Sequence, residues 1–538
     1  MNRIKIGVAE KGENLLSVNI KIAKASLILI AASVFGHILS MGKEIIVANY
    51  FGISKSLDAF YVALTIPNMV FSTILSPFTI IFIPIFIKNK LQDKEEANRI
   101  ASILVNYIFI ILLVFALFVS IFSKYIIRYG FSGLDAETSA LSIKILRILA
   151  VSIVFSGLVR VLESILNAYE HFLWPAITQM FITISIILSI VLLLKQWGVY
   201  VFVWGTLIGL ILQFAFLVPI SGQKGYTHYF DYNWNHPEIR KILKLMLIFL
   251  ALTAIGGLNP VINRIMASWL PSGSIAALAY ADKLIQVPII IFAGSITTAI
   301  YPFLSTQFAE NKMEEMKNTL ATSIKMGGFI FIPMAITMIV LAEPIVKLLF
   351  QRGAFDNTAT KLTSKIFIYY ALQLFSIYAL AFMTRLILIF HDMLNYLKIT
   401  IVSILLNILL NFVFMRIINP PAAGIALSTS TGFFISTLFC FYILKKKITY
   451  LHGLSIFKSL LKITLVGIIS GIVTFFVFHK LNTFFNTSIV YQVIKLGGSA
   501  TAGAASFILI TFLLKIEETA KIYNLIRKHR FSFGELFS

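Results

Sequence analysis

Long apolar stretches, separated by short breaks that contain charged residues, Pro or Gly, recur along almost the whole chain. Each stretch has about 20 residues or more, the length that an α-helix needs to cross the hydrocarbon core of a bilayer. The pattern predicts about fourteen membrane-spanning helices, near residues 26–50, 58–87, 100–123, 141–168, 173–195, 198–220, 241–268, 274–306, 321–342, 360–390, 394–415, 422–444, 458–479 and 488–514. The predicted fold class is an all-α polytopic membrane protein, because no break is long enough for an ordinary soluble domain.

The chain also resembles itself. Pro84 aligns with Pro302, and, at nearly the same offset along the chain, the segment that begins at Asp135 aligns with the segment that begins at Asp356. Two matches in the same order at nearly the same offset predict two pseudo-symmetric six-helix lobes followed by two extra helices. Parallel repeats of this kind build transporters whose site lies between the halves, at mid-membrane depth.

The breaks divide the chain into six parts. These are an N-terminal segment (1–25), the N-lobe (26–220), a linker (221–240), the C-lobe (241–444), helices thirteen and fourteen (458–514) and a tail (515–538). Most Lys and Arg residues outside the apolar stretches fall in breaks on the same side as both ends of the chain. By the positive-inside rule, we expect both termini and the linker to be cytoplasmic.

Composition agrees with a membrane protein and narrows the partners. The chain is 59% hydrophobic and 13% charged, whereas soluble proteins have roughly 25% charged residues. The formal charge of +22 is spread beside the apolar stretches rather than over one basic face, so we expect the phospholipid bilayer, and no nucleic acid, as a partner.

The N-terminal segment lacks an apolar core followed by a cleavage site, so we expect no removable signal peptide. The single cysteine, Cys440, excludes an intrachain disulfide.

Charged residues interrupt the first two apolar stretches. Lys43 and Glu44 lie within the first, and Asp58 opens the second. A charge near the bilayer centre costs at least about 2.5–3.5 kcal/mol, so it is usually paired, placed at an interface or turned toward water. The last arrangement would require a cavity inside the protein.

The second half carries charges in the corresponding stretches, Arg264 and the adjacent Asp282 and Lys283. If the halves face one another, Lys43, Arg264 and Lys283 would meet in a central chamber and bind an anionic substrate, since ammonium and guanidinium groups are the usual phosphate binders. The alternative is that Lys43–Glu44 and Asp282–Lys283 neutralise each other or extend to an interface.

Other buried polar residues allow two interpretations. Arg160 and Glu163 are three apart on one helix face, which suits a structural ion pair as well as a substrate contact. Asn407 and Asn411 would offer carbonyl oxygens to a small cation or hydrogen bonds between helices. The chain has no Walker loop, Gly-x-Ser-x-Gly or Asp-x-Asp motif, which favours a transporter over a membrane enzyme.

Four segments closely resemble the MurJ/MviN family of lipid II flippases, within the multidrug/oligosaccharidyl-lipid/polysaccharide exporter superfamily. They are GKEIIVANYFGISKSLDAFYVALTIPN, LESILNAYEHFLWPAI, MASWLPSGSIAALAYADKLIQVP and LAEPIVKLLFQRGAFDNTATKL, in the family's order within residues 26–445. The resemblance implies a fourteen-helix, two-lobed fold with a cationic cavity. It implies that an undecaprenyl-diphosphate-linked sugar, first of all lipid II for peptidoglycan synthesis, crosses the bacterial cytoplasmic membrane. It also implies that helices thirteen and fourteen form a groove for the polyprenyl tail.

The family's functional charges carry over in part. The matching positions, with His37 in place of an Arg, are His37, Lys43, Glu44, Asp58, Asp282 and Lys283. Phe71 stands where the family has an Arg, and Ser76-Pro77-Phe78-Thr79 replaces its Glu-Gly-Ala-Phe. Asn263 replaces the helix-seven Asp that is proposed in some members to help bind sodium.

These departures leave alternatives open for the substrate and for energy coupling. A flippase for an O-antigen or exopolysaccharide lipid would keep the cavity and change its specificity, whereas a drug/cation antiporter would require acidic cavity residues. We expect a monomer without cofactor or bound metal, driven by the membrane potential or by a monovalent cation. Candidates for a cation site are Asn263, Asn407 and Asn411.

Overall fold

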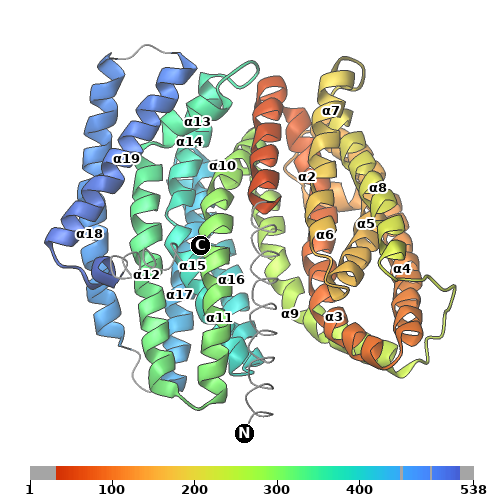
Figure 1. Cartoon of the computed structure of the whole chain (residues 1–538). Coiled ribbons are helices and arrows are strands. Elements are labelled where there is room, and N and C mark those ends of the chain that lie inside the picture. The colour runs from red at the N-terminus through yellow and green to blue at the C-terminus, as the bar shows by residue number, and fades with distance from the viewer. Residues whose placement is uncertain (1–31, 449–451, 485–487, 522–538) are drawn as a thin grey trace, which may run out of the picture. The chain divides into compact units, whose positions relative to one another are not determined.

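The computed structural model of the chain describes residues 32–448, 452–484 and 488–521, except for the side chains of residues 76, 248, 251, 252, 298 and 299 (Figure 1). All regular secondary structure in these ranges is helical. The helices form two compact units. Residues up to Val47 group with Ser54–Trp269, and residues Ala48–Ile53 group with the chain from Leu270 onward.

The first unit contains residues 32–47 of the first helix, which runs to residue 51, and nine further helical segments. These are α2 (Lys55–Val70), η1 (Phe71–Leu75), α3 (Ser76–Gln92), α4 (Lys94–Gly130), α5 (Ala136–Ala168), α6 (Leu173–Thr178), α7 (Met180–Trp197), α8 (Tyr200–Gln223) and α9 (Pro237–Ala267). Residues 224–236 connect α8 to α9 and are fastened to α4 by side-chain hydrogen bonds, including Asn98 Nδ2 to the Gly225 carbonyl (3.0 Å).

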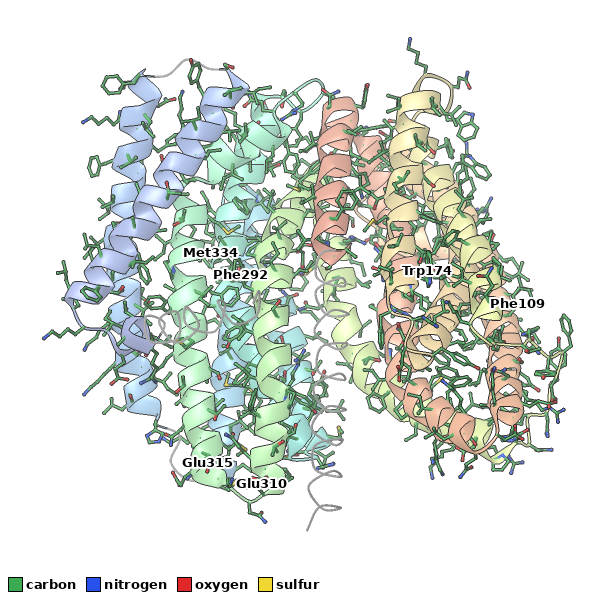
Figure 2. All side chains as sticks on the ribbon, viewed as in Figure 1. Phe109, Trp174, Phe292, Glu310, Glu315 and Met334 are labelled. Atoms are coloured by element: carbon green, nitrogen blue, oxygen red, sulfur yellow. The ribbon has the colours of Figure 1, made fainter. Side chains whose placement is uncertain are left out.

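The second unit continues from Leu270 through the remaining helices. These are α10 (Ser274–Pro288), η2 (Ile289–Ala293), α11 (Gly294–Ala309), α12 (Met313–Val340), α13 (Ala342–Phe350), α14 (Asn357–Ala371), α15 (Leu374–Ile389), α16 (Met393–Ile417), α17 (Pro421–Lys447), α18 (Gly453–Phe484) and α19 (Ile489–Leu513). Glu310 and Glu315 lie at one end of this unit, whereas Phe292 and Met334 lie toward the middle of its helices (Figure 2).

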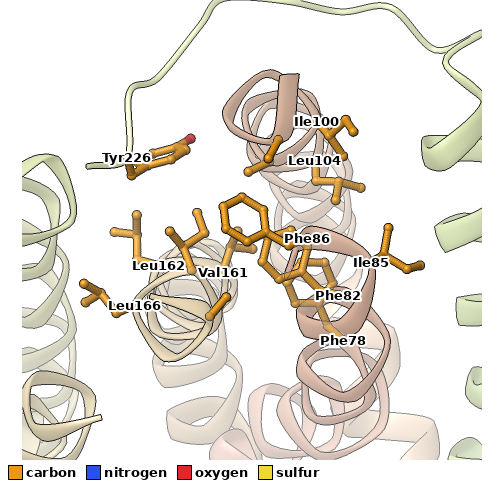
Figure 3. Packing of buried hydrophobic residues seen from close by; sticks show 14 of the residues in the cluster. Phe78, Phe82, Ile85, Phe86, Ile100, Leu104, Val161, Leu162, Leu166 and Tyr226 are labelled. Atoms are coloured by element: carbon orange, nitrogen blue, oxygen red, sulfur yellow. The ribbon is translucent and has the colours of Figure 1, made fainter. Parts of the chain in front are cut away.

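An aromatic row on α3 forms the centre of one core in the first unit. Phe78, Phe82 and Phe86 are each at most 1% exposed, and successive ring centroids are 5.1 and 5.2 Å apart. Residues four apart lie on the same face of a helix, so the row packs as one surface against Leu104 of α4 and Leu162 of α5 (Figure 3). This packing holds α3, α4 and α5 together at one end of the unit.

Two π-helical turns interrupt helices that correspond in the internal repeat. η1 (Phe71–Leu75) separates α2 from α3, and η2 (Ile289–Ala293) separates α10 from α11, so the two turns keep the same offset as Pro84 and Pro302. Asp135 and Asp356 correspond as well, because each caps a helix by accepting a hydrogen bond from a backbone N–H in its first turn. These correspondences confirm the predicted duplication, and π turns often mark functional positions in helices.

Within the described residues, eleven helices are long and apolar enough to cross a membrane, or twelve if α14 and α15, which bend by 40° where they meet, count as one span. Every one of the fourteen predicted spans overlaps a described helix. The spans near 26–50 and 241–268 are not among the twelve, and both include residues that the structure does not describe in full. The count of fourteen therefore stays a prediction.

The boundaries of the predicted lobes also stay a prediction. Grouping by contacts places α9 in the first compact unit, whereas the sequence repeat assigns its residues to the C-lobe. The two criteria measure different things, since the repeat reflects common origin and the units reflect which helices pack together.

Candidate transport site

Lys43 and Glu44, which neighbour each other on the first helix, form an ion pair. Lys43 Nζ lies 2.8 Å from Glu44 Oε1, and the two side chains are 18% and 2% exposed. Glu44 Oε2 also accepts a hydrogen bond from the Tyr61 hydroxyl of α2 (3.5 Å). The pair satisfies the buried carboxylate and leaves part of the ammonium group accessible.

Arg264, in the last turn of α9, contacts α2 one turn beyond Tyr61. Its Nη1 donates to Thr65 Oγ1 (3.0 Å), and Thr65 Oγ1 donates in turn to the carbonyl oxygen of Tyr61 (3.0 Å). Tyr61 and Thr65 are four residues apart and therefore share a face of α2. That face brings the Lys43–Glu44 pair and Arg264 together within the first unit.

A third cation lies over the beginning of η1. The guanidinium carbon of Arg160 is 4.7 Å from the centre of the Phe71 ring, and Arg160 Nη1 donates to Glu163 Oε2 (3.1 Å). Gln213 of α8 donates to the other oxygen of Glu163 (3.2 Å). The Arg160 guanidinium has no second hydrogen-bond acceptor among the described residues, and its Nε is buried without an acceptor. Its Nη2 and Nε therefore lack acceptors in the part of the chain that the structure describes.

Lys43, Arg160 and Arg264 define what we call the cationic row. They come from three different helices. Lys43 acts through Glu44 at Tyr61, Arg264 contacts Thr65, and Arg160 lies over Phe71, so all three meet α2 or η1. Positions 61 and 71 are ten residues apart, and ten helical residues rise about 15 Å, which is about half the thickness of the hydrocarbon core of a membrane.

His37 and Asp58, predicted from the resemblance, have other surroundings. Asp58 is 3% exposed in the first turn of α2, where a carboxylate stabilises the positive end of the helix dipole. His37 lies on the first helix, and its Nε2 is buried without a hydrogen-bond partner in the described residues. A substrate role for either residue stays a prediction.

Asp282 and Lys283 lie on α10 in the second unit. Asp282 Oδ1 accepts a hydrogen bond from Gln286 (3.4 Å), one turn away. Lys283 is exposed and forms no ion pair with any residue that the structure describes, whereas Lys43 and Glu44 form one. Its convergence with Lys43 and Arg264 stays a prediction.

The asparagines weighed as cation ligands are divided between the units. Asn263 lies on α9, whereas Asn407 and Asn411 are buried on α16, where Asn411 Nδ2 donates to Asn407 Oδ1 (3.2 Å). Asn407 also donates to Thr429 of α17 (3.4 Å). This is a hydrogen bond between helices, the alternative to a cation site that the sequence left open. No group of three or more His, Cys, Asp or Glu side chains suited to a metal occurs in the described ranges.

An apolar depression of about 420 Å³ lies on the second unit between α12 and α18. It is lined by Ile336, Val340, Ile468, Gly471, Ile472, Phe475 and Phe476. A depression of this composition suits a hydrocarbon chain. The groove predicted for helices thirteen and fourteen, which correspond to α18 and α19, stays a prediction.

Sequence reasoning identified Arg160 and Glu163 as a pair but missed the contact between Arg160 and Phe71. In the sequence, Arg160 stands out for its charge and Phe71 as a departure from the family pattern. Their proximity depends on the packing of η1 against α5, for which the sequence contains no local signal.

A duplicated helical fold whose spans contain buried charged side chains defines a multi-pass membrane transporter. The family model described as "Lipid II flippase MurJ" matches residues 47–494. The chain belongs to the lipid II flippase MurJ family.

Individual relatives agree with this assignment. The "Probable lipid II flippase MurJ" of Buchnera aphidicola subsp. Acyrthosiphon pisum (strain APS) is 26% identical over 86% of this chain and 92% of its own length. The "Lipid II flippase MurJ" of Burkholderia cenocepacia is 24% identical, over 79% of this chain and 84% of its own.

Solved structures show the same fold. A structure titled "Lipid II flippase MurJ, inward closed conformation" aligns with a TM-score of 0.77 and 26% identity, covering 91% of this chain and 99% of the other. An inward-facing MATE family multidrug transporter aligns with a TM-score of 0.64 and 16% identity, covering 78% and 95%, and so shares the fold alone.

Proposed function

We propose that this protein moves lipid II from the inner to the outer leaflet of the bacterial cytoplasmic membrane by alternating access. The observation that carries the proposal is the cationic row, three cations that meet successive positions of α2 and η1 in a member of the lipid II flippase family. A diphosphate offers several acceptor oxygens, and charge-assisted contacts to it are about twice as strong as neutral hydrogen bonds.

The individual groups have different tasks in this proposal. Arg160 and Arg264 bind phosphate oxygens with planar forks, and Lys43 contributes a point charge. Lys283 of the second unit completes the site when the lobes close around the headgroup. The polyprenyl tail stays in apolar surroundings such as the depression between α12 and α18, so only the polar headgroup enters the chamber.

The same chemistry supports a second candidate, another undecaprenyl-diphosphate-linked oligosaccharide such as an O-antigen or exopolysaccharide precursor. Phe71 and Ser76 stand where the resemblance implies an Arg and a Glu, and the cationic row recognises the diphosphate rather than the sugar. The sugar-binding part of the cavity therefore decides between the two substrates.

For energy coupling, we favour the membrane potential, with a monovalent cation as the alternative. Moving one negative charge outward across an inside-negative membrane releases about 2.3 kcal/mol per 100 mV, so the potential favours export of a diphosphate. Both termini are cytoplasmic in this proposal, and the protein works as a monomer without a cofactor.

Complementation tests the function directly. The protein is expressed in a bacterium whose own lipid II flippase is depleted, and growth and the appearance of lipid II in the outer leaflet are measured. Restored growth with outward lipid II is the expected result. Failure there, combined with rescue of a strain that lacks its O-antigen flippase, would assign the second substrate.

A further inference from the structure

A basic cavity of about 900 Å³ lies in the second unit, where α17 ends, α18 begins and the chain leaves α19. Five lysines from these segments and from α12 line it, namely Lys325, Lys445, Lys458, Lys462 and Lys515. We call this cavity the lysine pocket. None of its residues belongs to the cationic row, which lies in the first unit.

Lys325 anchors the wall of the lysine pocket. Its side chain is 9% exposed, and its Nζ donates to Ser455 Oγ (2.9 Å) and lies 3.5 Å from Glu517 Oε2. The second carboxylate of the pocket, Glu518, accepts a hydrogen bond from Ser459 Oγ (2.9 Å). Both acidic groups thus have partners on α12 or α18.

The other four lysines keep their charge available. Lys445, Lys458, Lys462 and Lys515 are exposed, and none of them forms an ion pair with a described residue. Lys458 and Lys462 are four residues apart on one helix, an arrangement that repels unless an anion lies between the charges. The first-turn N–H groups of α18, which begins at Gly453, add the positive end of a helix dipole.

Apolar side chains flank these charges. Leu454 and Phe457 are 68% and 63% exposed on α18 beside Lys458, and Leu514 is 60% exposed beside Lys515. A free phosphate ion would occupy a small part of a 900 Å³ cavity and would leave these side chains in water. A lipid satisfies both features, because its phosphate meets the lysines while its acyl chains cover the leucine and phenylalanine side chains.

We propose that the lysine pocket binds the phosphate-bearing headgroup of an anionic phospholipid of the cytoplasmic leaflet. Basic pockets between membrane-spanning helices on the cytoplasmic side are the usual form of such sites. A bound headgroup ties α12, α18 and the segment after α19 together, because each contributes a lysine. Binding therefore stabilises the second unit without occupying the transport site.

The test uses the full-length protein, purified in detergent and titrated with phosphatidylglycerol, with phosphatidylcholine as the neutral lipid. Thermal unfolding is followed for the wild type, for K458A/K462A, for K458R/K462R and for the matched control K88A/K398A, whose lysines are exposed and lie outside the pocket. We expect phosphatidylglycerol, and not phosphatidylcholine, to raise the unfolding temperature. The concentration required should rise about tenfold or more in K458A/K462A, because each lysine contributes on the order of 1 kcal/mol to binding anionic lipid. The arginine variant and the control should respond like the wild type.

Separate arms distinguish the sources of phosphate. An equal response of K458A/K462A and the wild type to phosphatidylglycerol would overturn the proposal. Full stabilisation by inorganic diphosphate alone would also overturn it, because the pocket would then be a site for a soluble anion. Stabilisation by undecaprenyl diphosphate and not by phosphatidylglycerol would overturn it as well, because the pocket would then be a substrate site. If K458A/K462A does not fold, K515A replaces it under the same criteria.

Discussion

The guanidinium of Arg160 stacks on the ring of Phe71, with its central carbon 4.7 Å from the ring centre. Arg160 belongs to α5 and Phe71 to η1, so the contact joins two helices that are far apart in sequence. The resemblance to the family implies an arginine at the position that Phe71 occupies in this chain. The contact places the guanidinium of Arg160, from a neighbouring helix, over this position.

The first prediction is that Arg160 is required for transport. Removing a charge-assisted contact to phosphate costs on the order of 1.5–3 kcal/mol, so R160A/E163Q should transport about 10- to 100-fold more slowly than E163Q. Glu163→Gln is included because Arg160→Ala alone would leave a buried carboxylate without its partner, which destabilises proteins strongly. Lipid II in the outer leaflet is measured at equal protein level in the depletion strain.

Relocating the guanidinium provides the control for this prediction. F71R added to R160A/E163Q places an arginine next to the space that the Arg160 fork occupied, and should restore most of the lost rate. If R160A/E163Q transports as fast as E163Q, Arg160 has a structural role only. Loss of transport without recovery by F71R would show that a guanidinium at position 71 does not replace that of Arg160.

The second prediction concerns the lysines of the two units. K43A/E44Q, compared with E44Q, and K283A, compared with the wild type, should each abolish growth in the depletion strain without lowering protein level. Glu44→Gln is included because Lys43→Ala alone would leave a buried carboxylate without its ion-pair partner. K43R and K283R should be tolerated, because a cation rather than an ammonium group is required. K88A, which removes an exposed lysine of α3, is the matched control. Full activity of K43A/K283A would remove both residues from the mechanism.

The fold was predictable from the sequence to the extent that it depends on periodicity and repetition. The internal repeat predicted that the segments containing η1 and η2 correspond to each other. Both segments contain a π-helical turn at the corresponding place, as expected for duplicated segments. The π turns themselves were not predicted, since an apolar stretch has the same hydropathy in α- and π-helical registers.

For the site, local pairs were predictable and contacts between helices were not. The three-residue spacing of Arg160 and Glu163 predicted a shared helix face, and the structure shows an ion pair there. The hydrogen bond from Arg264 to Thr65 crosses 199 positions of sequence and depends on how α9 packs on α2. Hydropathy and spacing contain no information on such packing.

The third prediction is the topology. Single cysteines at positions 50–57 or 480–487 should react with an impermeant thiol reagent in intact cells, whereas cysteines at 448–456 should react only after permeabilisation, because most Lys and Arg residues lie on the side of the termini. C440S supplies the background, and Cys440 is buried, so the substitution removes a thiol without changing the surface. Labelling at 448–456 in intact cells would reverse the orientation and move the lysine pocket to the outer surface.

The last prediction is a pH dependence of stability at Asp392. Its carboxylate caps α16 and accepts a hydrogen bond from Lys447, and this contact is the main cause of a pKa below the ordinary value of 3.8. A carboxyl group with a lowered pKa stabilises the folded state above its unfolded pKa, and this contribution is lost as the pH falls through the folded pKa. Asn is also a good helix cap, so D392N removes the charge and keeps the cap. D392N should be less stable than the wild type at pH 7 by up to about 1 kcal/mol, the usual range for a partly exposed ion pair.

The difference between D392N and the wild type should shrink once the pH falls below the ordinary pKa of 3.8, where Asp392 becomes protonated in the unfolded chain, and should vanish only below the lower pKa of the folded protein. D392A, which also removes the cap, should lose about 0.5–2 kcal/mol more at every pH. Thermal unfolding of the three purified proteins between pH 3 and pH 8 measures both effects. Equal stability of D392N and the wild type at pH 7 would show that the contact with Lys447 contributes nothing. A difference as large at pH 3 as at pH 7 would assign the loss to packing rather than to charge.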